Sequence, residues 1–168
     1  MAAQDGADVV VRTAEADDVP AVCRFGATHV AAHYAPILGP EGARAQVRQW
    51  WGDAYVGRAV ADGVVLVAER AGELAGVAQH GRLGDDHVVW KLYVHPDHRG
   101  TGLGPRLLRA VADRLPPDAD RLWVEHVAAN VRAGAFYERE GFTVQRVETH
   151  PSGDDRHAVV WRSRPLRA

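Results

Sequence analysis

The sequence predicts a single mixed α/β domain with a mostly antiparallel central sheet flanked by helices, and three observations support this fold class. The chain has 168 residues, the usual length of a domain with its own hydrophobic core. No composition break, Gly/Ser-rich linker or internal repeat divides it, so we expect one domain over residues 1–168. Short β-rich runs and helical patterns alternate in the order β-α-α-β-β-β-α-β-α-β-β.

The N-terminal half predicts one strand, two helices and then three strands. Residues 9–12 are rich in valine and form the first strand. Asp17 or Asp18 caps a helix that accommodates Pro20 in its first turn and ends near Pro36. We expect the remaining elements of this half at residues 43–51 (helix) and at residues 64–68, 74–80 and 88–94 (strands).

The C-terminal half predicts two helices, each preceded by a strand. Glycines at 100–104 open a helix whose apolar residues recur at helical spacing until Pro116. A second helix, residues 130–140, ends at Gly141, a residue that favours the position just after a helix. The remaining strands are expected at residues 122–127, 142–147 and 158–161.

Composition excludes several classes of protein. A formal net charge of −2 argues against a nucleic-acid partner, because phosphate contacts need a clustered positive surplus. No apolar run reaches the ~20 residues of a membrane span, and the N-terminus lacks the apolar stretch of a signal peptide. The single cysteine, Cys23, excludes an internal disulfide and a multi-cysteine zinc site. We therefore expect a cytoplasmic protein that binds neither nucleic acid nor membrane.

A glycine-rich turn is the most informative segment. In Arg99-Gly-Thr-Gly-Leu-Gly104, alternate glycines leave little side-chain bulk between a strand and a helix. Backbone N–H groups can approach a ligand there, and a helix N-terminus adds roughly half a positive charge, so the turn predicts an anion site. Pro105 replaces the lysine of a Walker loop, and the turn follows the fourth strand, unlike a dinucleotide-binding loop.

A second motif, about thirty residues after the turn, narrows the kind of anion site that the turn can form. Asn130-Val-Arg-Ala-Gly-Ala-Phe-Tyr-Glu-Arg-Glu-Gly-Phe142 resembles the Asn-x-x-Ala-x-x-Phe-Tyr-x-x-x-Gly-Phe element of the GNAT superfamily of N-acetyltransferases. The turn resembles the Arg/Gln-x-x-Gly-x-Gly/Ala pyrophosphate loop of the same family. Together with the strand before the turn, the resemblance covers residues 88–142 and implies a GNAT-like fold.

The resemblance implies that acetyl-CoA is the acyl donor. In such proteins the fourth and fifth strands separate, and pantetheine hydrogen-bonds to the exposed main chain of the fourth. The pyrophosphate lies on the glycine-rich turn, and Asn130 reaches the cofactor arm from the other side. The cofactor-binding residues implied are Leu92, Tyr93, Val94, Arg99, Gly100, Thr101, Gly102, Leu103, Gly104 and Asn130.

Acetyl transfer needs a neutral amine and a proton for the departing thiolate. A lysine-like amine is only about one part in 10³ neutral at pH 7, so a base or a dry pocket must favour the neutral form. By resemblance, Tyr137 is the acid beside the sulfur. Many relatives carry a glutamate on the fourth strand, where Lys91 is the only charged residue here. Glu125 on the fifth strand is the first candidate base, acting directly or through a water, and His80 is the second.

The acceptor is a primary amine of a small molecule or a peptide, and residues 30–62 carry no motif that identifies it. Aromatic residues in this stretch, among them Tyr34, fit a pocket, a core or a dimer contact equally well. No metal site is expected, since Val30 replaces the glutamate of a His-Glu-x-x-His helix at His29 and His33. A non-catalytic acyl-CoA sensor is the alternative function, and a homodimer is left open.

Overall fold

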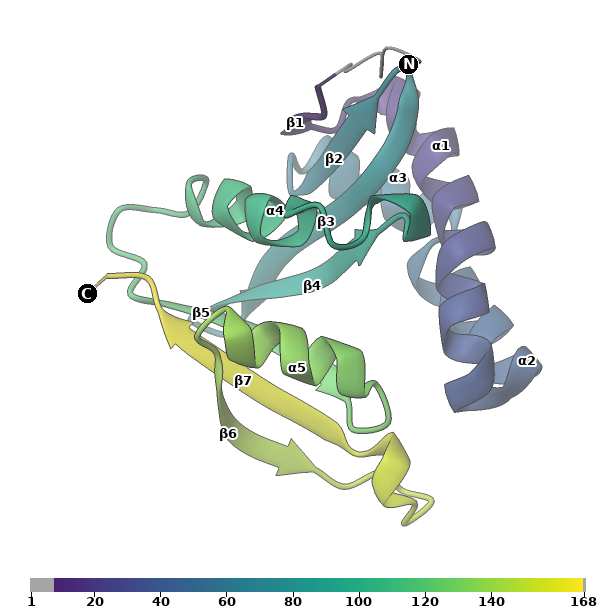
Figure 1. Cartoon of the computed structure of the whole chain (residues 1–168), viewed down its shortest axis with the longest axis vertical. Coiled ribbons are helices and arrows are strands. Elements are labelled where there is room, and N and C mark those ends of the chain that lie inside the picture. The colour runs from purple at the N-terminus through teal and green to yellow at the C-terminus, as the bar shows by residue number, and fades with distance from the viewer. Residues whose placement is uncertain (1–7, 168) are drawn as a thin grey trace, which may run out of the picture.

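The computed structural model describes residues 8–167 as one twisted sheet with helices on both faces (Figure 1). Its strands are β1 Val10–Thr13, β2 Val65–Arg70, β3 Glu73–Leu83, β4 Asp86–Val94, β5 Arg121–Val127, β6 Thr143–Glu148 and β7 Val159–Pro165. Its α-helices are α1 Val19–Phe25, α2 Ala31–Trp50, α3 Asp53–Ala61, α4 Leu103–Ala112 and α5 Val131–Arg139. A π-helical turn, Gly26–Val30, joins α1 to α2, and short 3₁₀ turns occupy Ala16–Asp18, Pro96–His98 and Asp155–His157.

The strand order is β1-β2-β3-β4-β5-β7-β6, and within residues 8–167 every strand pair is antiparallel except β4 with β5. The predicted fold class is therefore confirmed. The structure adds α3 to the expected order, in a stretch to which we assigned no element, and it extends most strands by a few residues.

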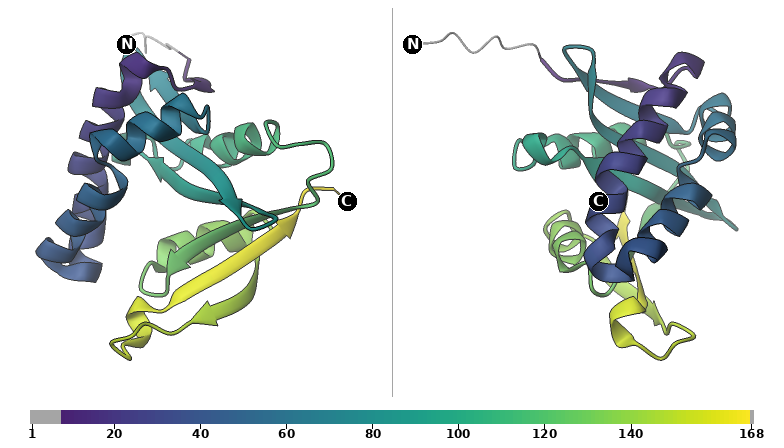
Figure 2. Two further views of the ribbon diagram at one scale, coloured as in Figure 1. Left: turned by 180° about the vertical axis from the view of Figure 1, so that it is seen from behind. Right: turned by 90° about the vertical axis from the view of Figure 1, so that its right-hand side faces the viewer.

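Helices α4 and α5 cover one face of the sheet, and α1 to α3 cover the other (Figure 2). On the first face α4 buries Leu107, Leu108 and Val111 completely, which explains their helical spacing in the sequence. On the second face Phe25 packs on Trp51, with ring centroids 6.3 Å apart. No helix of the described residues has both the length and the apolar character that crossing a bilayer requires.

Helix α2 is broken between residues 36 and 43, where the sequence predicts that one helix ends and the next begins. It runs past Pro36 and stops being helical at Gly39, whose φ of +76° favours glycine. Pro40 follows and has no N–H to donate to the preceding turn. In the π-helical turn before α2, a Cβ on Gly26 would lie 2.5 Å from the Trp51 ring, so glycine is needed for this close packing.

Strands β4 and β5 are paired over only three residues each. Val88 faces Trp123 and Val89 faces Val124, and beyond these pairs the parallel ladder ends. Figure 1 shows β4 and β5 diverging from that point toward α2. The separation of the fourth and fifth strands that the family resemblance implied is therefore present in the structure.

A lysine lies buried on the β4 face opposite α4. Lys91 is 6% exposed, its Nζ donates a 2.6 Å hydrogen bond to Gln79 Oε1, and the Trp51 and Tyr55 rings lie over it at 5.2 and 4.4 Å. In residues 8–167 no carboxylate forms an ion pair with it. Burial disfavours the ammonium form and lowers the pKa of Lys91 to about 7.

Lys91→Met is expected to remove a pH dependence of stability. With a folded pKa of about 7 and an unfolded pKa near ~10.4, the unfolded state binds the extra proton between these values. The free energy of unfolding of the wild type therefore rises with pH there, by at most about 1.4 kcal/mol per pH unit. Urea unfolding between pH 7 and 8.5 measures the difference in slope between wild type and variant.

Gln79→Leu is the matched control, because it removes the hydrogen-bond partner and keeps the buried amine. This variant should be less stable than the wild type yet retain the rise of stability with pH. Equal slopes for wild type and Lys91→Met would show that Lys91 is charged in the folded protein.

Candidate active site

Two cavities meet where β4 and β5 separate. The first, of about 490 Å³, lies on the side of the glycine-rich turn, and the second, of about 370 Å³, lies between α2, β4, β5 and the β6–β7 loop. We call them the donor cavity and the acceptor cavity. The residues that line both are Leu92, Tyr93, Asn130, Ala133 and Tyr137. A molecule in one cavity can therefore contact a molecule in the other beside Tyr137.

The glycine-rich turn forms the end of the donor cavity. Gly100 and Gly102 have φ angles of +75° and +84°, which disfavour any residue with a Cβ. The N–H groups of Leu103 and Gly104 begin α4 and have no acceptor within the helix, and Pro105 has no N–H. A Cβ on Gly104 would lie 3.0 Å from the Phe136 ring, so glycine allows α4 and α5 to approach. The turn offers an anion main-chain donors and no side-chain bulk.

Arginines surround this anion site. Arg99, Arg132 and Arg139 line the donor cavity together with the glycines. Partial burial and the nearby Arg132 hold the pKa of Arg99 below its ordinary value, and a guanidinium remains charged in spite of such a shift. Two like charges held together favour a ligand with more than one negative charge.

The middle of the donor cavity is lined by the free edge of β4. The N–H of His95 donates to Ala75 on β3, and main-chain groups alternate in direction along a strand. Those of Leu92 and Val94 therefore point away from β3, into the gap left by β5. Unpaired main-chain groups need partners, and an extended ligand carrying amides would supply them.

Tyr137 lies at the junction of the two cavities. It is 7% exposed, and its ring packs on His126, Phe136 and Phe142 at centroid distances of 6.2, 5.3 and 5.5 Å. Gly141, at φ +86°, ends α5 as expected and turns the chain so that Phe142 lies against Tyr137. Burial raises the pKa of Tyr137 above its ordinary value, with smaller contributions from Tyr34 and Glu125, so the phenol keeps its proton.

Two further tyrosines form the wall next to Tyr137. The hydroxyl of Tyr93 donates to that of Tyr34 at 3.0 Å, and burial raises the pKa of both. Tyr93 also packs edge-on against Trp51, with centroids 5.4 Å apart. Helix α2 is thereby fixed against β4, and both tyrosines stay neutral.

Glu125 lines the acceptor cavity from β5. Burial raises the pKa of its carboxyl, Glu148 raises it further, and Arg146 opposes the shift. It is the only carboxylate that lines this cavity in the described part of the chain. A carboxyl with a raised pKa, held close to three neutral tyrosines, has the properties of a general base.

The neighbouring histidines are engaged elsewhere. His126 Nδ1 lies 3.0 Å from the Val127 carbonyl, and its Nε2 accepts from Arg162 Nε at 3.1 Å, so neither nitrogen is free to take a proton. His33 Nε2 lies 3.0 Å from Asn130 Nδ2, whose Oδ1 accepts from the Ala133 N–H and caps α5. Burial lowers the pKa of both imidazoles.

Most of the predicted site residues lie together, and two lie apart. The structure places Tyr137 and all the predicted cofactor-binding residues except Thr101 along the donor cavity, and Glu125 along the acceptor cavity. The hydroxyl of Thr101 donates to the His98 carbonyl at 2.6 Å and stabilises the turn. His80, the second candidate base, lies on β3 and lines neither cavity.

Sequence reasoning did not find several lining residues. Arg132 and His33 border the donor cavity, and Gln46, His150 and His157 border the acceptor cavity. Arg132 lies at a variable position of the second motif, and this location near the predicted cofactor site is the one feature of the sequence that points to it. In residues 8–167 no group of three or more His, Cys, Asp or Glu side chains is arranged to hold a metal ion.

Comparison with known proteins agrees with this geometry. Residues 61–144 match the model of the acetyltransferase (GNAT) domain. The chain is 30% identical over 140 residues to the L-amino acid N-acyltransferase MnaT of Escherichia coli, covering 80% of this chain and 79% of that protein. It is 31% identical over 99 residues to the ribosomal protein bS18 alanine N-acetyltransferase of the same species, covering 56% and 66%.

Solved structures of low sequence identity share the fold. The PaiA N-acetyltransferase of Thermoplasma acidophilum, solved in complex with coenzyme A, superposes with a TM-score of 0.80 at 16% identity, covering 94% of this chain and 99% of that one. The family-model match spans half of the chain, and the first of these relatives spans most of it. The chain therefore belongs to the GNAT family of acetyltransferases.

Proposed function

We propose that the protein transfers an acetyl group from acetyl-CoA to a primary amine of a small molecule or peptide, with Tyr137 as general acid and Glu125 as general base. The observation that carries this proposal is that the donor and acceptor cavities meet beside Tyr137. Family membership supports acetyl transfer, and the coenzyme A bound in the PaiA structure supports the same donor here.

The donor cavity fits the parts of acetyl-CoA in sequence. The main-chain donors of residues 100–104, with Arg99 and Arg132, suit the diphosphate. The free main chain of Leu92 and Val94 suits the two amides of the pantetheine arm. This placement brings the thioester to the β4–β5 gap, where Tyr137 lies.

The reaction follows from the groups at the junction. Glu125 accepts a proton from the acceptor ammonium, directly or through a water, and the neutral amine attacks the thioester carbon. The new C–N bond forms as the C–S bond breaks, and Tyr137 donates its proton to the departing sulfur. The acylated nitrogen loses its second proton, which restores the phenol of Tyr137, and Glu125 releases the first proton to solvent. Its high pKa suits this role, because the phenol keeps a proton until the thiolate forms beside it.

We also infer that the protein acts in the cytoplasm and uses no nucleic acid or membrane as a partner. The net charge of −2 and the single cysteine support this inference. The exposed edge strand β6, with Val144 and Val147 about half exposed, supports a homodimer formed through this edge.

Tyr137→Phe is expected to lower kcat about 10²-fold and to leave the Kd for acetyl-CoA unchanged, because only the proton donor is lost. Release of free CoA with a panel of amines measures kcat, and calorimetry measures Kd. The matched control is Tyr55→Phe, which removes a hydroxyl bonded to Gln79 outside both cavities. Acetyl-CoA binding without turnover of any amine in the wild type would instead identify an acyl-CoA sensor.

Glu125→Gln is expected to lower kcat/KM and to remove the acid limb of its pH profile. A base with a raised pKa works only above that pKa, so the wild-type rate falls as the pH drops through it. Glu148→Gln is the control, and it should shift the acid limb instead of removing it. The substitution removes a charge that raises the pKa of Glu125, so the acid limb should move to lower pH. An acid limb that survives in Glu125→Gln assigns the base elsewhere.

Gly102→Val is expected to weaken acetyl-CoA binding at least about tenfold. The φ of +84° is strained for valine, so the substitution would distort the turn that lines the donor cavity. Gly84→Val provides the control, since Gly84 also has a positive φ of +60° but lies in the β3–β4 turn outside both cavities. Calorimetry should show weaker binding for the first variant and wild-type binding for the second.

A further inference from the structure

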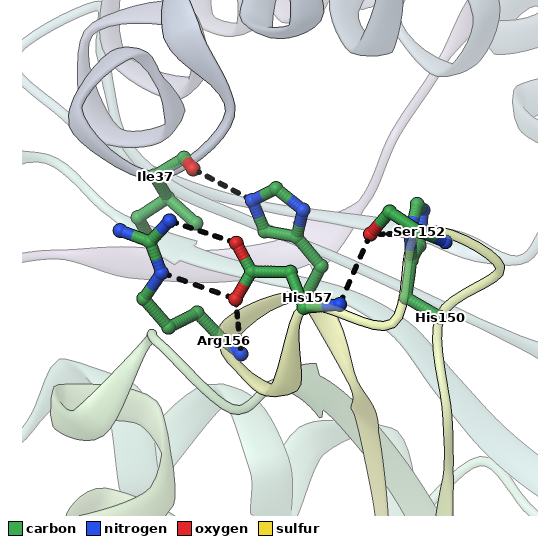
Figure 3. Close-up of polar contacts among 6 residues, drawn as sticks. Ile37, His150, Ser152, Arg156 and His157 are labelled. Carbon is green, nitrogen blue, oxygen red and sulfur yellow. Dashed lines mark hydrogen bonds and ion pairs between the residues drawn. The ribbon is translucent and has the colours of Figure 1, made fainter.

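Two histidines form the outer end of the acceptor cavity. His150 and His157 belong to the loop between β6 and β7, and their rings lie nearly perpendicular with centroids 5.4 Å apart. Figure 3 shows His157 directed at the carbonyl of Ile37 on α2, with His150 and Ser152 beside it. The proposed mechanism uses neither imidazole.

The hydrogen bonds of His157 fix where its proton lies. Its Nε2 lies 3.1 Å from the Ile37 carbonyl oxygen (Figure 3), and a carbonyl can only accept, so Nε2 carries the hydrogen. The break at Gly39 explains why this carbonyl needs a donor from outside the helix. In the neutral ring Nδ1 then presents a lone pair.

His150 has the opposite arrangement. Its Nδ1 accepts from the Ser152 N–H at 3.1 Å and lies 2.7 Å from the Ser152 hydroxyl, so its hydrogen is on Nε2. Among residues 8–167 nothing bonds to His150 Nε2 or to His157 Nδ1. The pair therefore has one N–H donor and one acceptor that are free to bind a ligand, on two imidazoles that both line the acceptor cavity.

The charges around this end disfavour an anionic ligand. No Arg or Lys side chain lines the acceptor cavity in the described residues, and Glu125 contributes a carboxylate. Arg156, next to His157 in sequence, is paired with Asp154 at 2.7 Å, and Arg162 donates to His126. Arg146 acts on Glu125 from outside the lining. A second carboxylate brought in by the acceptor would therefore find no Arg or Lys side chain on the wall of the cavity to pair with.

The sheet register places the two ends of the cavity within reach of one small ligand. Glu125 faces Trp161 in the β5–β7 ladder, and His157 lies four residues before Trp161. Four residues span at most about 13 Å even when fully extended, and His157 lies in the 3₁₀ turn just before β7. A ligand with its amine near Glu125 can thus reach the histidine pair with its next polar group.

We propose that the acceptor amine belongs to a molecule whose neighbouring polar group is a neutral amide, as at the amino terminus of a peptide, and that His150 and His157 bind this amide. An amide carries one carbonyl acceptor and one N–H donor, which match the free N–H of His150 and the free Nδ1 of His157. This inference rests on the proposed function and narrows its acceptor from any amine to an aminoacyl amide or peptide.

The test compares acceptors that differ only in this group. For several side chains, the free α-amino acid, its carboxamide and a dipeptide beginning with the same residue are assayed for release of CoA from acetyl-CoA. The wild type should use the carboxamide and dipeptide with at least about tenfold higher kcat/KM than the free amino acid. Preference for the free amino acid would overturn the inference and leave the proposed function standing.

Variants test the two histidines separately. His150→Phe and His157→Phe keep a ring and should raise KM for the carboxamide about tenfold, with little change in kcat or in KM for the free amino acid. His157→Gln keeps a donor for Ile37 and an acceptor for the amide, so it should restore much of the lost affinity. His87→Phe, at the opposite end of β4 and outside both cavities, is the control.

Calorimetry with CoA present distinguishes failure of the proposed function from failure of the inference about the two histidines. If no amine is acetylated, the proposed function fails, and binding of the carboxamide is then compared directly with binding of the free amino acid. Tighter binding of the carboxamide, lost in His150→Phe, would support the inference on its own. Equal binding of the two, or binding unaffected by both histidine variants, would overturn it.

Discussion

The short pairing of β4 with β5 is the constraint on which the site depends. A parallel ladder that ends at Val89 and Val124 leaves Leu92 and Val94 without a strand partner on the β5 side, in the middle of an otherwise continuous sheet. Such groups are costly to bury unsatisfied, so the gap has to be filled by a ligand or by water. Helix α5 lies at this gap, because its cap residue Asn130 and its Tyr137 line both cavities that meet there. The binding site is therefore an incomplete part of the sheet rather than an addition to its surface.

Burial at the junction determines the chemistry that its side chains can perform. Tyr34, Tyr93 and Tyr137 are all held neutral by loss of solvent, and the same loss raises the pKa of Glu125. Low polarity thus favours a phenol that still has its proton and a carboxyl that is basic enough to take one. On β4, Lys91 lies on the face opposite α4 and is bound to Gln79 among aromatic rings. The proposed base accordingly lies on β5, across the gap.

The sequence predicts the donor side of the site well and the acceptor side poorly. The glycine-rich turn and the Asn130–Phe142 segment are local: backbone conformation and helix caps are set by residues a few positions apart, so motifs reveal them. The acceptor cavity is not local, because it combines α2 with β5 and with a loop more than a hundred residues later in the chain, and no pattern within one segment encodes that contact. Helix α3 was missed because it is short and has Gly57 at its centre, which weakens the helical signal. His80 was misplaced because a strand's two faces cannot be told apart from alternation alone.

The contact between His157 and Ile37 shows how such a cavity acquires a specific polarity. Pro36, Gly39 and Pro40 end the first part of α2 and leave Ile37 with a carbonyl that needs a donor, and the imidazole of a distant loop supplies it. Satisfying that carbonyl fixes the tautomer of His157 and hence the kind of atom that it turns toward a ligand. Ser152 does the same for His150 with the opposite result. The helix break thus determines, through the Ile37 carbonyl, which nitrogen of His157 can accept a hydrogen bond from a ligand. Together with His150 this gives the acceptor end of the site a fixed donor and acceptor, with which it can select among amines.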